Sequence, residues 1–176
     1  MESVLPVTSA DVLRLVQQAL ERFDIDPLDA ALRRTVRIAS LLGETQIAVR
    51  LGLELKPSGG HPPANAEMTR RLMADPEEWG DPNGVAEAAV QDFFNSRKLD
   101  DGNIAAHSID ELVFWERKAL PDEELSASQY ESNLKWNLKR IEIMGRTKHE
   151  AFTCLCQWER RLSFAATQER ALHAVS

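Results

Sequence analysis

Apolar residues recur along most of this 176-residue chain at intervals of three and four positions. This spacing places them on one face of an α-helix, because the helix completes a turn about every 3.6 residues. No run of β-branched residues alternates with polar residues between turn signals, as it would in a half-buried strand. The pattern therefore predicts an all-α fold, a helical bundle of seven or eight helices.

The N-terminal third of the chain predicts three helices. The first begins at a cap on Thr8 and ends at about Phe23. The second begins after Asp26, whose side chain is expected to cap it, and ends at Gly43. The third covers residues 44–55 and stops before a proline-glycine turn. The positions expected to be buried in these helices include Val12, Leu13, Val16, Leu20, Phe23, Leu28, Ala31, Leu32, Thr35, Ile38, Ala39 and Leu42.

The middle of the chain is less regular. Residues 56–84 are rich in proline and glycine and predict an exposed connection, interrupted by a short helix at about 65–74. A helix over residues 83–97 follows. Ser108 and Glu111 then have the spacing of a capping box, in which each side chain accepts a hydrogen bond from the other residue's backbone amide. That pair predicts the start of another helix.

The last fifty residues predict an antiparallel helical hairpin over 126–176. Ser128 is expected to open its first helix, Gly145 to end it, and Thr147 to open its second helix. The second helix has an apolar seam at steps of four and three, formed by Ala151, Leu155, Trp158, Leu162, Ala165, Glu169 and Leu172. The first helix offers a row for this seam to cover, formed by Tyr130, Leu134, Leu138, Ile141 and Met144. The seam fits either a bundle interior or a dimeric coiled coil.

These elements divide the chain into an N-terminal helical domain, residues 1–125, which contains the loop 56–84, and the hairpin 126–176. The hairpin either stands apart or belongs to the same domain. Of the four tryptophans, Trp115 and Trp158 lie on faces expected to be buried. Trp136 lies on the flank of its helix, where it is either exposed at a contact surface or covered.

Charge is spread unevenly over the chain, whose net charge is −7. Residues 1–66 have 8 acidic and 7 basic side chains, residues 67–125 have 15 and 6, and residues 126–176 have 5 and 8. The acidic middle argues against general nucleic-acid binding, which depends on Lys and Arg at phosphates. An acidic middle beside a basic end suits self-association or a charged protein partner, although it also fits an ordinary solvated surface.

One basic strip is predicted on the second and third helices, formed by Arg33, Arg34, Arg37 and Arg50. These arginines could contact RNA or an acidic partner. Alternatively, their aliphatic stems cover the core while their charged ends pair with carboxylates such as Asp29.

Several features bear on the compartment. No apolar stretch approaches the roughly 20 residues of a membrane span, and the first residues lack the basic region of a signal peptide. Cys154 and Cys156 are two apart on a helix and so point about 200° from one another, too far for a disulfide or a shared metal. We therefore expect a reduced, cytoplasmic protein with no membrane contact.

Motifs that would indicate catalysis are missing from the sequence. It has no phosphate-binding glycine loop and no nucleophile elbow. His107, Asp110 and Glu111 are the best metal candidates, but the capping box already explains Glu111. Helical ribonucleases of the HEPN class carry arginine and histidine four to six residues apart, whereas nine residues separate Arg97 from His107. We expect no catalytic residue, metal or cofactor.

A resemblance to a known family lies within residues 26–60. The stretch has a helix of leucines and alanines, a Leu-Gly break, and a second helix that ends in Glu-Leu before a turn. The matching positions are Leu28, Ala31, Leu32, Arg33, Arg34, Ile38, Ala39, Leu42, Gly43, Leu51, Leu53, Glu54 and Leu55. It resembles the start of AbiTii-type domains, helical modules named for abortive infection and found in bacterial proteins linked to phage defence. The resemblance implies an interaction module and supplies no catalytic residues.

Together these patterns predict a non-enzymatic helical adaptor of a bacterial cytoplasmic assembly, linked to phage defence. It would bind a protein partner, or a second copy of itself, through the C-terminal hairpin. The residues predicted to make that contact are Trp136, Arg140, Leu155, Trp158 and Leu162. The alternatives are a helical nuclease or nucleic-acid-binding subunit, HEPN-like or metal-dependent, and a regulatory module that binds an effector.

Overall fold

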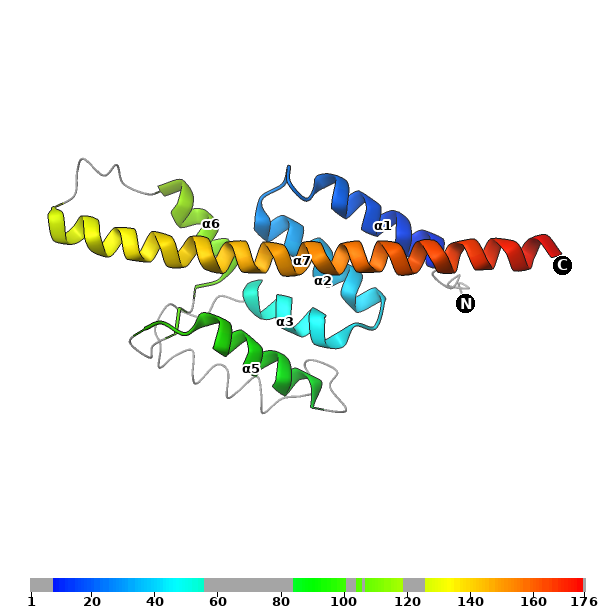
Figure 1. Ribbon diagram of the computed structural model, residues 1–176, viewed down its shortest axis with the longest axis horizontal. Coiled ribbons are helices and arrows are strands. Elements are labelled where there is room, and N and C mark those ends of the chain that lie inside the picture. The colour runs from blue at the N-terminus through cyan, green and yellow to red at the C-terminus, as the bar shows by residue number, and fades with distance from the viewer. Residues whose placement is uncertain (1–7, 56–83, 101–103, 106, 119–125, 176) are drawn as a thin grey trace, which may run out of the picture.

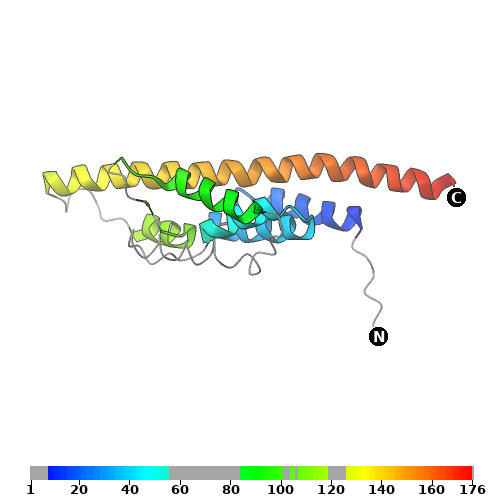
Figure 2. The same cartoon turned by 90° about the horizontal axis from the view of Figure 1, so that it is seen from below.

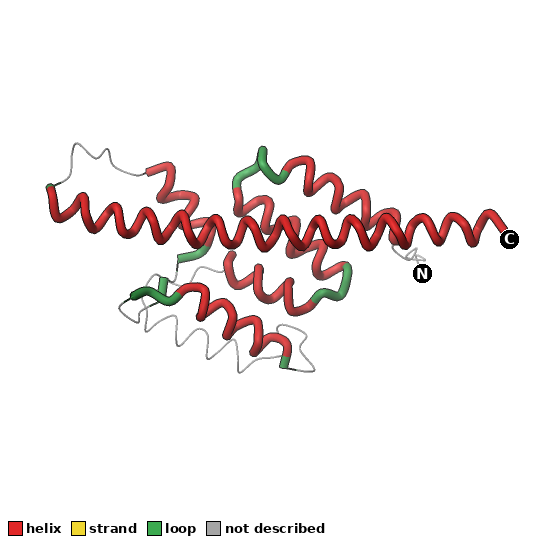
Figure 3. The backbone as a smooth tube through the Cα atoms, in the orientation of Figure 1, coloured by secondary structure: helices red, strands yellow, loops and turns green. Residues whose placement is uncertain are grey.

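The structure, a computed structural model, describes residues 8–55, 84–100, 104–105, 107–118 and 126–175. Its helices are α1 (Ser9–Arg22), α2 (Leu28–Leu41), α3 (Thr45–Leu55), α5 (Val85–Arg97), α6 (Ile109–Lys118) and α7 (Ala127–Val175) (Figure 1). The described residues contain no strand, only one isolated bridge between Lys98 and Ile104 (Figure 3). The all-α fold is confirmed, with six helices in the described residues. The helix predicted near 65–74 lies outside them.

The prediction of a C-terminal helical hairpin is wrong, because residues 127–175 form one uninterrupted helix of 49 residues (Figure 1). A helix of this length extends for about 74 Å. Viewed from the side, α7 lies along one face of the molecule with the other helices against it (Figure 2). Both described ends of α7 extend past its neighbours.

Three residues that the sequence predicts as helix ends, Ser128, Gly145 and Thr147, lie within α7 and neither begin nor end it. Gly145 has no positive φ, and a single glycine inside a helix costs only about 1 kcal/mol. The Thr147 hydroxyl donates to the Ile143 carbonyl at 2.9 Å, a bond within the helix instead of a cap. The true start is a capping box two residues before Ser128, in which the Ser126 and Gln129 side chains accept from one another's amides.

Caps fix the ends of the shorter helices. Thr8 and Asp11 form a capping box at the start of α1, as the sequence predicted for Thr8. Gly43 has φ +70° just after α2, the left-handed conformation that glycine adopts without strain. Asp26 does not cap α2; its carboxylate instead accepts hydrogen bonds from Arg22 and Arg34. Its neighbour Pro27 occupies the N-cap position, without a side-chain hydrogen bond.

The main core lies between α7 and the N-terminal helices. The α1 helix runs antiparallel to α7: Ser9 donates to Glu169 at 2.8 Å at one end, and the rings of Phe23 and Phe152 are 5.4 Å apart at the other. The buried apolar side chains of the core include Val12, Val16, Ala19, Leu32, Ile38, Leu51, Ile109, Leu112, Ile143, Leu155, Trp158 and Leu162. The predicted seam of α7 is therefore the interior of a bundle over most of its length.

A smaller apolar cluster joins α3 to α5 through Val49, Leu53, Ala89 and Phe93. Next to it, α6 begins at the predicted capping box, where the backbone N–H of Ser108 donates to Glu111 at 2.7 Å. Trp115 at the other end of α6 was expected to be buried and is 51% exposed. The apolar face of α6 is therefore buried at Ile109 and Leu112 near its start and exposed at Trp115 near its end.

Candidate interaction surface

The structure divides the five predicted partner-binding residues into two groups. Leu155, Trp158 and Leu162 are 0%, 3% and 6% exposed, and they belong to the core that α7 shares with α1. Charged substitutions at these positions would therefore test folding and not binding. A surface contact through α7 has to use other side chains.

Trp136 and Arg140 lie nearer the start of α7, one turn apart. The Trp136 ring is half-buried and lies 5.1 Å from the His107 imidazole, centroid to centroid. Arg140 is only 7% exposed, and its Nε and Nη1 atoms are buried without a hydrogen-bond partner. Its Nη2 reaches only Asn137, at 3.4 Å. Arg140 therefore faces inward, whereas Trp136 is only partly covered.

The opposite face of the same part of α7 is apolar and open. Tyr130, Leu134, Leu138 and Ile141 are between 44% and 59% exposed. At about 100° per residue, these four side chains lie within about 80° of one another around the helix axis. We call this row of four residues the α7 stripe. These are the side chains that the predicted hairpin would have covered, and the unbroken helix leaves them uncovered.

Charged residues of both signs border the α7 stripe along one side. In order along the helix they are Glu131, Lys135, Glu142 and Arg146, so the signs alternate. Within the chain, Lys135 pairs with Glu131 at 3.4 Å, and Arg146 pairs with Glu142. All four side chains are at least 42% exposed. A partner on the stripe would therefore meet this row of charges.

A hollow of about 710 Å³ lies on the same side of α7. It is lined by Leu99, Asp100, Lys135, Trp136, Leu138, Lys139 and Glu142. Leu138 belongs to both the stripe and the hollow, so the two are continuous. The hollow therefore extends the open surface of α7 beside Leu138.

Comparison with known proteins adds no identification. No family model, no curated protein and no solved structure matches this chain. The resemblance to AbiTii-type domains therefore stays a prediction.

The arginine and histidine considered for a HEPN-like nuclease are close in space, but not as a catalytic pair. Arg97 donates to the His107 backbone carbonyl at 2.8 Å, and its side chain is 1% exposed. The His107 ring is occupied by its contact with Trp136. The Arg97 guanidinium is thus enclosed in the protein and cannot reach a large substrate.

The candidate metal ligands are also committed to other contacts. Asp110 accepts from Arg33 on α2 at 2.5 Å, and Glu111 caps α6. Within the described ranges, no three side chains of His, Cys, Asp or Glu are grouped so that they could hold a metal ion.

Among the helices that the structure describes, none has the length and apolar character needed to cross a membrane.

The two cysteines are free thiols in different settings. Cys154 is buried in the core, whereas Cys156 is exposed. Burial, followed by the nearby carboxylates of Glu150 and Glu44, raises the pKa of Cys154 to about 11. Cys154 is therefore a thiol at neutral pH, without the nucleophilic thiolate of a catalytic cysteine.

The predicted basic strip is not one surface. Arg50 is buried with Glu54 on α3 and is 7% exposed, so it leaves the strip altogether. Arg33 bridges Asp29 and Asp110, and Arg34 pairs with Asp26. The predicted pairing of these arginines with carboxylates is therefore confirmed for Arg33, Arg34 and Arg50.

Proposed function

We propose that this chain is a non-enzymatic helical adaptor that acts by protein–protein contact through the α7 stripe, Tyr130, Leu134, Leu138 and Ile141. The observation that carries the proposal is the exposure of these four neighbouring apolar side chains on one face of a 49-residue helix. Single exposed apolar residues are ordinary, but a contiguous row bordered by charges is typical of an interaction site.

The occupant we favour is a second copy of α7, lying antiparallel across a two-fold axis. With the axis between residues 138 and 139, Lys135 of one copy faces Glu142 of the other, and Glu131 faces Arg146. Because the axis repeats each contact, the row of charges makes four opposite-charge pairs and no like-charge pair. Leu134 and Ile141 would interdigitate at the centre of the same seam.

Three further observations bear on the compartment and the partner of such an adaptor. Two free cysteines suit a reducing, cytoplasmic compartment. The resemblance of residues 26–60 to AbiTii-type modules supports a place in a bacterial phage-defence assembly. The charge of the chain, −7 overall, supports a protein partner over nucleic acid.

The first test is the mass of the protein in solution. We expect a dimer by light scattering, and we expect L138E combined with I141E to give a monomer with an unchanged helical circular dichroism spectrum. L172E is the matched control, since Leu172 is 73% exposed on the same helix but outside the stripe. A wild-type monomer at high concentration would contradict self-association and leave a different protein as the partner.

Charge reversal tests the antiparallel register separately. K135E places like charges opposite Glu142 twice and should weaken the dimer, whereas K135E combined with E142K should restore it. A parallel pair would show no such rescue, because residues 135 and 142 of the two copies would not face one another. Equal weakening in the single and the double variant would rule out this register.

A further inference from the structure

The open face of α7 continues past Ile141 towards the end of α1. At about 100° per residue, Gly145, Lys148 and Phe152 fall within the same sector of the helix, about 80° wide, as the α7 stripe. They extend the row in steps of four and three, the spacing of a seam between two helices. Gly145 and Lys148 are exposed, and Phe152 is 42% exposed. The surface open to a partner is therefore longer than the stripe itself.

A hollow of about 280 Å³ lies on this extension, where the end of α1 reaches the middle of α7 (Figure 1). Its lining residues are Phe23, Asp24, Gly145, Lys148, His149 and Phe152. The hollow is smaller than the roughly 300–1,000 Å³ of pockets that enclose drug-sized ligands. Its size therefore suits one inserted side chain.

The hollow has aromatic walls and a charged rim. The rings of Phe23 and Phe152 are tilted against each other, with their centroids 5.4 Å apart. Lys148 Nζ lies 2.9 Å from Asp24 Oδ1 and 6.0 Å from the centroid of the Phe23 ring. At Gly145 the hollow is open, since a Cβ there would have no described atom of another segment within 4 Å. An aromatic ring with a polar tip matches this combination of walls and rim.

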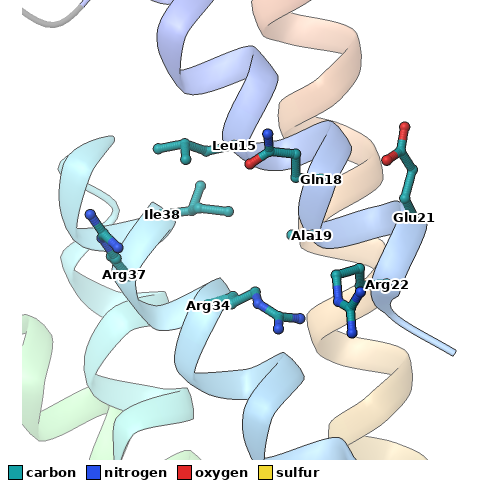
Figure 4. Close-up of a pocket in the computed structure, with 8 residues that line it drawn as sticks. All are labelled: Leu15, Gln18, Ala19, Glu21, Arg22, Arg34, Arg37 and Ile38. Carbon is teal, nitrogen blue, oxygen red and sulfur yellow. The ribbon is translucent and has the colours of Figure 1, made fainter. Parts of the chain in front are cut away.

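The larger cavity between α1 and α2, of about 390 Å³, has no such convergence. Two arginines that line it, Arg22 and Arg34, are paired with Asp26. In the close-up view the Arg37 guanidinium lies on the other side of Ile38 from these two arginines (Figure 4). The basic groups of that cavity therefore do not meet around one ligand.

Tyr130, at the start of the α7 stripe, carries a ring of the required kind. It is 44% exposed and is the single tyrosine of the chain. In the antiparallel pair proposed for the stripe, Tyr130 of one copy is as far before the axis as residue 147 of the other copy is after it, so it lies level with the gap between Gly145 and Lys148. A helical side chain also leans towards the N-terminus of its own helix, which in this pair is towards Phe152 of the other copy. Its position and its direction both bring the ring to the hollow.

We propose that Tyr130 of each copy inserts into the hollow at Gly145 of the other copy and anchors the two ends of the α7 pair. The inference rests on the antiparallel pairing proposed for the α7 stripe, and it adds Phe23 of α1 to that interface. The ring would pack on Phe23 and Phe152, and its hydroxyl would face the charged rim. Because the two-fold axis repeats the contact, the pair holds two such anchors. Aromatic side chains buried in a pocket of the partner carry much of the binding energy of protein interfaces.

Sedimentation equilibrium of the full chain tests the anchor through the dissociation constant of the dimer. Y130A should raise this constant about tenfold or more, because it empties both hollows. G145F should raise it to a similar extent, because a ring of the same chain then takes the space. The double variant, Y130A with G145F, should be no weaker than the weaker single variant, because both changes remove the same contact.

Each of these two changes has a matched control. F164A removes a ring that is 66% exposed on the same helix but does not line the hollow, so the dissociation constant should change by no more than about twofold. G145A adds one methyl group and leaves most of the hollow empty, so it should keep the dimer. Neither G145A nor G145F should lower the melting temperature of the monomer, measured below the dissociation constant, because alanine and phenylalanine both favour a helix more than glycine does.

The results separate failure of the anchor from failure of the pairing. A wild-type dimer in which Y130A acts no more strongly than F164A would overturn the anchor and leave the α7 stripe as the interface. Effects of Y130A and G145F that multiply in the double variant would also overturn it, because the two residues would then act at separate places. A wild-type monomer at high concentration would contradict the pairing itself, and the anchor with it.

Discussion

Arg97 on α5 donates to Glu54 on α3, and both side chains are 1% exposed. Glu54 also accepts from Arg50, which in turn reaches Glu150 on α7 at 3.3 Å. Arg97 additionally donates to the carbonyls of Ala105 and His107. This chain of ion pairs, the buried network, ties α3, α5 and α7 to the segment before α6.

Loss of Glu54 should be the most damaging single change in the buried network. Removing one partner of a buried ion pair leaves an uncompensated charge and costs about 3 to 5 kcal/mol. We expect E54A to lower the free energy of unfolding by that amount in urea titrations. E54L combined with R97M should lose less, because no charge of that pair remains unpaired.

The control for Glu54 is an exposed pair. Glu131 and Lys135 are 71% and 77% exposed, so E131A should cost no more than about 0.5 kcal/mol. A loss in E54A as small as that in E131A would show that the buried network contributes little to the free energy of unfolding.

Arg140 is the reverse case, a buried charge without a carboxylate partner in the described residues. It is 7% exposed, and two of its nitrogen atoms make no hydrogen bond. An apolar replacement of similar length removes the desolvation cost, so R140M should leave the melting temperature unchanged or raise it by about 2 to 4 °C. R146M should lower it, because Arg146 pairs with Glu142 and donates to the Ser96 carbonyl. A larger loss in R140M than in R146M would show that Arg140 has a partner.

The two cysteines should differ sharply in reactivity. The pKa of the buried Cys154 thiol is raised to about 11, so at pH 8 very little of it is thiolate, whereas Cys156 is exposed. Iodoacetamide should add one group to the native protein and two after denaturation, as counted by mass spectrometry. C156S should remain unmodified until it is unfolded. Equal rates at the two cysteines in the folded protein would contradict the burial of Cys154.

Asp26 should make the stability of the folded protein depend on pH between about pH 4 and pH 2. Its pKa is about 2 in the folded protein, below the usual value of about 3.9 in an unfolded chain. The stabilisation is therefore complete above about pH 4 and is lost as the pH falls towards 2. The melting temperature of the wild type should exceed that of D26N by a constant margin at pH 5–7, and the margin should shrink between pH 4 and pH 2. A margin that stays constant down to pH 2 would contradict the pairing of Asp26 with Arg22 and Arg34.

Local signals predicted the short helices well. The capping boxes at Thr8 and Ser108 and the glycine at Gly43 fix helix ends through bonds between neighbouring residues, which a sequence displays directly. The same signals misled at Gly145 and Thr147, where tertiary packing against α1 and α3 outweighs the small cost of a glycine.

Contacts between distant residues were not predictable in this way. Glu54 and Arg97 are 43 positions apart, and no spacing rule links them. The apolar character of Leu134, Leu138 and Ile141 was plain from the sequence, but their exposure was not, because it depends on whether the helix folds back on itself. The cavity lined by Ala19 of α1 and Ile38 of α2 likewise forms only where these two helices lie side by side.

The antiparallel pairing of two α7 helices through the stripe can be checked by disulfide cross-linking of cysteines introduced one at a time in a C156S background, in which the remaining Cys154 is buried. With the axis between residues 138 and 139, the two copies of residue 138 are about 1.5 Å apart along the helix axis and those of residue 134 about 13 Å. A disulfide needs Cα atoms within about 7 Å, so L138C should form a covalent dimer on mild oxidation and L134C should not. Cross-linking of neither variant at concentrations where a dimer is expected, or of both variants equally, would contradict the antiparallel pair.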